Sequence, residues 1–170
     1  MEFVNRIIEG SYDDYHLRDL LRSSEDTATR LPQDEKIRHL QKVPILAECT
    51  KKQLKAVASI SRVVEVPAGT TLTRQGESGE EFFVILDGAA MVEVSKRKKI
   101  RLGPTQFFGE MSLLDGGPRS ATVRADTDMR LLVILRRNFQ AILTEVPDLT
   151  RNILIVLSGR VRDLEQSLNA

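Results

Sequence analysis

Cysteine, histidine, net charge and long apolar runs are all scarce in this chain, and each scarcity argues against a class of protein. Cys49 is the only cysteine among 170 residues, so no disulfide can form within the chain, and we expect an inert thiol in a reducing compartment. His16 and His39 are the only histidines, which argues against a transition-metal site. The formal net charge of +1 provides no overall basic field for binding nucleic acid.

Membrane and secretory features are scarce as well. No apolar run is long enough to cross a membrane, and the N-terminus lacks the basic start and apolar stretch of a signal peptide. The composition, with 41% apolar and 29% charged residues, is typical of a soluble globular protein, so we expect a cytoplasmic chain. The motifs of phosphate-loop NTPases, zinc proteases and serine hydrolases do not occur, and we predict no enzymatic activity.

The chain divides into a short leader and one domain. In residues 1–33, apolar residues recur at three- and four-residue spacing, which predicts one or two short amphipathic helices. A partly ordered leader is the favoured interpretation, and an arm that contacts a partner is the alternative. Residues 34–170 form the predicted domain, with helices in 34–60, a barrel in 61–136 and C-terminal helices in 137–168.

Short alternating segments separated by Gly or Pro turns predict about eight strands within the barrel. One of them, EFFVIL at 81–86, is apolar on both faces and is therefore expected to be buried on both sides. Among the helices, the first should end near Pro44 and the next should be capped by Thr50. Pro147 suits the first turn of the last helix.

The segment 107–126, FFGEMSLLDGGPRSATVRAD, carries the clearest chemical signal. Gly109 allows a ligand to approach the backbone closely, and the short helix expected after it presents free N–H groups to an anion. Arg119 offers a fork of donors that matches a phosphate, whereas Glu110 can accept hydrogen bonds from sugar hydroxyls. As isolated residues, the two would form a surface ion pair beside a turn. As parts of one segment, they suit a ligand with one phosphate and one free ribose hydroxyl.

This segment resembles the phosphate-binding cassette of the cyclic nucleotide-binding domain family. That family includes regulatory subunits of cyclic-AMP-dependent kinase, catabolite activator proteins and cyclic-nucleotide-gated channels. The resemblance extends from about Glu35 to about Gln166, and the cassette positions that match are Phe108, Gly109, Glu110, Pro118, Arg119, Ser120 and Ala121. It implies a mostly β fold, an eight-stranded jelly-roll β-barrel with helices before and after it.

The resemblance also implies a regulatory module that binds a cyclic nucleotide and couples binding to movement of its flanking helices. Arg119 would pair with the cyclic phosphate, helped by Ser120 and the N–H of Ala121, and Glu110 would accept from the ribose 2′-hydroxyl. The expected ligand-binding residues are Phe108, Gly109, Glu110, Met111, Pro118, Arg119, Ser120, Ala121 and Arg160.

Two of these positions bear on which nucleotide binds. Cyclic-GMP-selective kinase sites of the family carry threonine after the arginine, so Ser120 favours cyclic AMP, with cyclic GMP as a weaker ligand. Counted without gaps from Arg119, Arg160 takes the position of an arginine that reaches the purine in bacterial channels of the family. An exposed helix arginine without such a role is the equally weighted alternative.

The last helix carries an apolar heptad seam that predicts either packing on the barrel or a homodimer. Its members are Leu154, Leu157, Val161, Leu164 and Leu168. The output would pass to an effector protein. Two alternatives to a cyclic AMP sensor stay open, a cyclic GMP sensor and a dimerisation or docking scaffold that binds no nucleotide. The basic turn at 96–99 would allow a nucleic-acid-binding function, but a solvated turn is the favoured interpretation.

Overall fold

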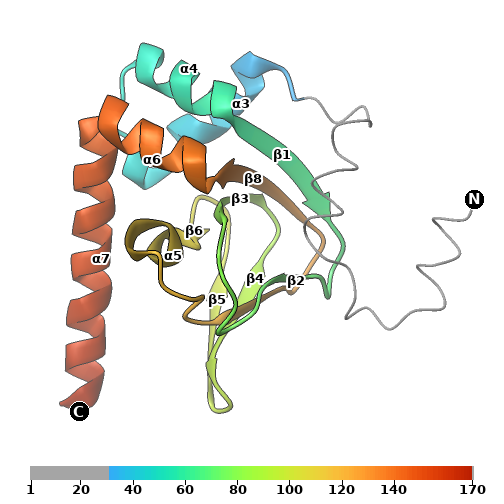
Figure 1. The fold of residues 1–170 in the computed structure, drawn as a ribbon. Helices are drawn as coiled ribbons and strands as arrows, with labels where there is room; N and C mark the ends of the chain where they lie inside the picture. Colours follow the sequence, from blue (N-terminus) through green and yellow to red (C-terminus); the bar gives the residue numbers. More distant parts are fainter. Residues whose placement is uncertain (1–30, 170) are drawn as a thin grey trace, which may run out of the picture. The chain divides into compact units, whose positions relative to one another are not determined.

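The computed structural model describes residues 31–169, which fall into two compact units (Figure 1). Among the described residues, one is a β unit of residues 61–136, and the other is a helical unit of residues 32–60 and 137–169. The leader predicted for residues 1–33 lies almost wholly outside the described part. Within that part, every helix is too short or too polar to cross a membrane.

The β unit consists of two antiparallel sheets of four strands each. The first has the order β1 (Ser61–Val66), β8 (Met129–Leu135), β3 (Glu81–Asp87) and β6 (Phe107–Phe108). The second has the order β2 (Thr71–Thr73), β7 (Thr122–Ala125), β4 (Ala90–Ser95) and β5 (Lys98–Leu102). The predicted mostly β fold of eight strands is confirmed. The pairings among the described strands leave the barrel open, because no strand pair joins the two sheets.

Strand β3 is one of the two inner strands of the first sheet, and its position explains its sequence. It pairs with β8 on one side and with β6 on the other. Phe82, Phe83, Val84 and Ile85 are all at most 3% exposed, which confirms the prediction of burial on both faces. Phe83 and Ile85 join side chains of both sheets in the core, together with Val64, Val66, Leu72, Ala90, Phe108, Val123, Ala125, Met129, Leu131 and Val133.

The N-terminal helices of the helical unit begin and end for local reasons. Helix α4 (Lys51–Ile60) is capped as predicted, because the Gln53 N–H donates to Thr50 Oγ1 and the Thr50 N–H donates to Gln53 Oε1. Helix α3 (Gln33–Gln41) ends three residues before Pro44, since the residue before a proline is disfavoured in the α region. A 3-10 turn, η2 (Pro44–Leu46), follows.

The C-terminal helices are α6 (Arg136–Glu145) and α7 (Pro147–Leu168), and Pro147 occupies the first turn of α7 as predicted. In α7 only Leu149 and Ile153 are buried, and the Asn152 side chain donates to the Ile45 carbonyl of η2. The free thiol of Cys49 lies in this unit. Burial raises its pKa and the charges of Asp148 and Glu48 raise it further, which supports an unreactive thiol.

Candidate functional site

The segment predicted to bind phosphate folds as a strand, a short helix and two glycine turns. Strand β6 ends at Gly109, whose φ of +89° begins α5 (Glu110–Asp115), and Gly116, with a φ of +71°, ends that helix. Both angles favour glycine because a side chain would strain the backbone there. The Asp115 carboxylate accepts from the Gly117 N–H and tightens the second turn. The predicted helix and its predicted break are therefore confirmed.

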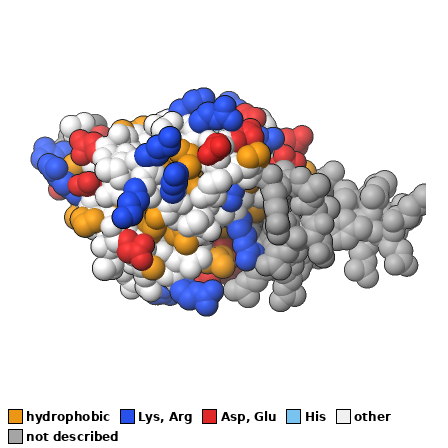
Figure 2. Space-filling view, turned by 90° about the horizontal axis from the view of Figure 1, so that it is seen from above, with side chains coloured by type: hydrophobic (Ala, Val, Ile, Leu, Met, Phe, Trp, Pro, Cys, Tyr) orange, Lys and Arg blue, Asp and Glu red, His pale blue; other side chains and the backbone are white. Residues whose placement is uncertain are grey.

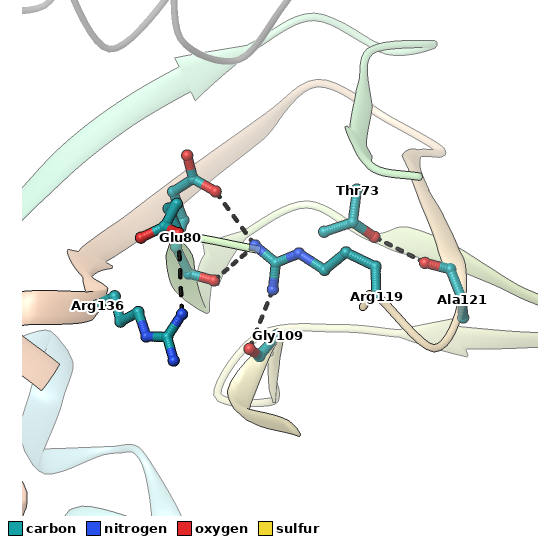
Figure 3. Close-up of polar contacts among 7 residues, drawn as sticks. Thr73, Glu80, Gly109, Arg119, Ala121 and Arg136 are labelled. Carbon is teal, nitrogen blue, oxygen red and sulfur yellow. Dashed lines mark hydrogen bonds and ion pairs between the residues drawn. The ribbon is translucent and has the colours of Figure 1, made fainter. Parts of the chain in front are cut away.

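Arg119 is the central group of this site. Its side chain is only 5% exposed, yet it carries a full positive charge. Nη1 donates to the Gly109 carbonyl at 3.0 Å, and Nη2 donates to the carbonyl and to Oε2 of Glu81 at 2.9 and 3.1 Å. The guanidinium also lies over the Phe83 ring, 5.9 Å from its centroid. Figure 3 shows the guanidinium pointing toward Gly109 on one side and toward the chain at Glu80 on the other.

The electrostatics of Arg119 follow from this placement. Burial lowers its pKa, and the charges of Glu81, Glu110 and Glu80 act in the opposite direction. The hydrogen bond that Arg119 donates to the Glu81 carboxylate also favours the charged form. An arginine keeps its proton in proteins, so the site holds a buried cation with three carboxylates around it.

Two glycines give the guanidinium its space. A Cβ added at Gly109 would lie 2.8 Å from Arg119 Nη1 and from the Glu81 carbonyl oxygen. A Cβ at Gly79 would overlap the Arg119 side chain directly. The backbone fixes the same arginine, since the Arg119 N–H donates to the Glu77 carbonyl and the Gly76 N–H donates to the Arg119 carbonyl. Arg119 thus joins the 76–81 segment to the segment after α5.

The other predicted site residues near Arg119 differ in how far they are exposed to solvent. Glu110 is only 2% exposed, in the first turn of α5. Ser120 and Met111 are exposed, and the Ser120 hydroxyl lies 3.8 Å from the Met111 sulfur. Ala121 accepts from the Thr73 hydroxyl, as Figure 3 shows.

Three predicted residues take other positions. Pro118 is exposed in the turn before Arg119. Phe108 lies in the core, with its ring stacked on Phe83 at a centroid distance of 4.7 Å. It therefore anchors the 107–126 segment to the interior of the β unit. Arg160 lies half-buried on α7, in the helical unit, and its predicted role stays a prediction.

The sequence reasoning missed Glu81, Gly79 and Phe83. The available signal was an acidic residue at the first position of an otherwise apolar strand. Glu81 and Phe83 are two residues apart on β3, so their side chains leave the strand on the same face, the face that meets Arg119. Finding this contact from sequence requires the pairing of β3 with β6, which brings Gly109 to the start of β3. Arg119 bonds to Gly109 there and so meets Glu81, which is 38 positions earlier in the chain.

Other candidate sites are weaker. The basic turn at 96–99 is exposed, and Ser95 Oγ accepts from the N–H groups of Arg97 and Lys98 within it. On the face seen in Figure 2, Lys and Arg side chains lie apart, with Asp and Glu among them, rather than in one basic field. Among residues 31–169, no group of three or more His, Cys, Asp or Glu is placed to hold a metal ion.

Comparison with known proteins places this geometry in context. Residues 63–146 match the family model described as "Cyclic nucleotide-binding domain". A cyclic nucleotide-gated potassium channel of Mesorhizobium japonicum is 36% identical over 107 residues, which is 63% of this chain and 30% of the channel. The chain therefore spans less than a third of the length of this curated relative.

Two solved structures share the fold. The catabolite activator protein of Thermus thermophilus has a TM-score of 0.68 and 27% identity, covering 74% of this chain and 62% of that one. The structure of PKAR CBD2 with Sp-2Cl-cAMPS bound has a TM-score of 0.66 and 25% identity, covering 82% of this chain and 93% of that one.

A glycine substitution tests the packing of the site. Gly109 and Gly69 share a φ of +89°, but a Cβ at Gly69 meets nothing within 4 Å. Gly69→Ala should therefore report backbone strain alone, about 1 kcal/mol. Gly109→Ala adds the overlap with Arg119 and the Glu81 carbonyl, and should cost about 1–3 kcal/mol more in urea unfolding. Equal losses in the two variants would contradict the tight contact between Gly109 and Arg119.

Proposed function

We propose, on the premise that this chain belongs to the cyclic nucleotide-binding domain family, that it binds a cyclic nucleotide, with cyclic AMP favoured, and acts as a regulatory module. The family match confirms the resemblance predicted from residues 107–126. Domains of this family are regulatory rather than catalytic. The observation that carries the proposal is the buried guanidinium of Arg119, held against Gly109 beside the buried carboxylate of Glu110.

Each group has a distinct role in the proposed complex. Arg119 donates to the exocyclic oxygens of the cyclic phosphate, and Ser120 and the Ala121 N–H add further donors. Glu110 accepts from the ribose 2′-hydroxyl, because a carboxylate suits a sugar hydroxyl and repels a phosphate. Gly109 permits close approach of the ligand. Met111 and Pro118 shape the surrounding surface, and Phe108 supports the segment from the core.

The preference for cyclic AMP rests on Ser120 and on one relative. Serine after the arginine is the residue that resembles cyclic-AMP-binding members of the family, and the similar PKAR CBD2 structure holds a cyclic AMP analogue. Cyclic GMP is the second candidate ligand. A scaffold that dimerises without binding nucleotide is the alternative of a different class, and the retained Arg119 and Glu110 argue against it.

Titration calorimetry tests nucleotide binding directly. The protein would be refolded free of nucleotide and titrated with cyclic AMP and then cyclic GMP. Arg119→Ala should weaken binding by about 2–4 kcal/mol, because the phosphate loses its charge-assisted partner. Arg124→Ala is the matched control, since it removes the same charge from β7 at an arginine paired with Glu93. Equal affinity of wild type and Arg119→Ala would refute the phosphate assignment.

The ribose contact is tested by pairing a variant with a modified ligand. Wild type should bind cyclic AMP about tenfold or more tightly than 2′-deoxy cyclic AMP, since a hydrogen bond to a carboxylate is lost. In Glu110→Gln this ratio should fall to about threefold, because a neutral amide oxygen is a weaker acceptor. Glu77→Gln is the control, because Glu77 is an exposed acidic residue of the same β unit. It should keep the wild-type ratio of affinities for the two ligands. An unchanged ratio in Glu110→Gln would remove Glu110 from the ribose site.

The regulatory output would come from coupling between ligand binding and the placement of the flanking helices. A ligand shifts such an equilibrium only by its differential affinity for the two placements of the helices. The predicted effector protein, the cytoplasmic location and the division into a leader of 1–33 and a domain of 34–170 remain predictions at this stage.

Helix α7 carries the proposed homodimer contact. Four members of the heptad seam, Leu154, Val161, Leu164 and Leu168, are more than half exposed. With Leu154 at position a, Arg160 falls at g and Glu165 at the following e. In a parallel pair of helices these two positions face each other across the seam and carry opposite charges. We therefore propose a parallel two-stranded coiled coil of two copies.

Sedimentation measurements test the dimer. Leu164→Asp places a charge in the seam and should convert the dimer to a monomer. Ile155→Asp is the control, because Ile155 is also 57% exposed but lies one residue off the seam. A monomeric wild type, or loss of the dimer in both variants, would contradict the proposed seam.

A further inference from the structure

Arg119 pairs with an acidic side chain of the same chain. Its partner is the carboxylate of Glu81, 3.1 Å from Nη2, and the Glu81 side chain is only 12% exposed. The carbonyl oxygen of Glu81 accepts from the same nitrogen at 2.9 Å. Glu81 therefore contributes two of the three hydrogen bonds that the described residues make to the guanidinium.

The neighbouring acid has a different partner. Glu80 precedes β3, and its carboxylate lies 3.9 Å from the guanidinium of Arg136 (Figure 3). Both of these side chains are at least one third exposed. Consecutive residues of an extended segment point to opposite sides, so Glu80 and Glu81 are separated by the backbone. Two adjacent carboxylates thus carry the same charge but only Glu81 contacts Arg119.

A cyclic phosphate bound at Arg119 would share the guanidinium with Glu81. Two anions at one buried cation repel each other, and this repulsion is little screened where solvent is excluded. The guanidinium has five N–H donors, so the ligand can bind without expelling Glu81, but it does so against the repulsion. The carboxylate also explains how a buried cation is tolerated in the absence of ligand, because an unpaired buried charge is strongly destabilising.

We propose that the Glu81 carboxylate is a built-in competitor of the ligand phosphate that keeps Arg119 neutralised in the free site and lowers affinity for cyclic nucleotides. This inference rests on the proposed function, because it concerns the same phosphate position. Glu81 is a positioning and affinity-setting residue. It raises the ligand concentration at which the module responds, and it stabilises the empty site.

The test compares three variants by titration with cyclic AMP. Glu81→Gln keeps an oxygen that accepts from Arg119 but removes the charge, and it should bind about 3- to 30-fold more tightly than wild type. Glu80→Gln removes the same charge from the residue before and should stay within about twofold of wild type, since its ion pair is exposed. Glu81→Asp keeps the negative charge and should stay within about threefold of wild type.

Thermal unfolding without ligand provides a second readout. Glu81→Gln should melt at a lower temperature than Glu80→Gln, because it leaves the buried Arg119 without its counter-ion. Added cyclic AMP should then raise the melting temperature of Glu81→Gln more than that of wild type.

The outcomes separate the two proposals. If wild type binds cyclic AMP and Glu81→Gln binds equally or more weakly, the competitor role is wrong and the proposed function stands. If Glu81→Asp tightens binding as much as Glu81→Gln, the carboxylate charge is not the cause and the inference also fails. If neither wild type nor Glu81→Gln binds either nucleotide, the proposed function fails and the inference fails with it. If only Glu81→Gln binds, competition by Glu81 is upheld, but the proposed function of the wild-type chain fails.

Discussion

A buried guanidinium, that of Arg119, is the constraint on which the rest of the site depends. Removing a charge from water is costly unless it is paired and hydrogen-bonded, so the chain must bring acceptors to it. The Gly109 and Glu81 carbonyls and the Glu81 carboxylate come from segments far apart in sequence. Their convergence fixes the loop after α5 against the start of β3. The same charge that would recognise a ligand thereby organises the segments around it.

The parts of the molecule that could be predicted from sequence are those set by local rules. Gly109 and Gly116 adopt left-handed angles, and those angles define the beginning and end of α5 without help from distant residues. Thr50 and Gln53 form a capping box for the same reason. The apolar run of β3 signals a central strand because it has no polar face to place in solvent. The eight strands and the short helix with its break followed from such features, whereas the jelly-roll fold and the roles of the cassette residues followed from the family resemblance.

The parts that could not be predicted depend on strand register. Glu81 meets Arg119 only because Phe83 pairs with Phe108, which brings Gly109 beside the start of β3. Sequence alternation indicates that Glu81 and Phe83 share a face but not what that face meets. Arg160 belongs to the other unit, so its relation to the cassette depends on an arrangement that local rules leave open.

Strand register also explains why one of two consecutive acids is functionally distinct. Along β3 the odd-numbered residues, Glu81, Phe83 and Ile85, leave the strand on one face, and Phe83 and Ile85 enter the core between the sheets. Glu81 therefore lies at the rim of an apolar interior, where a carboxylate needs a cation. A slip of one residue would place Glu80 there and turn Phe83 away from Phe108. Such a slip would break the pairing of β3 with both β6 and β8. The register of β3 against its two neighbours thus determines which carboxylate neutralises Arg119.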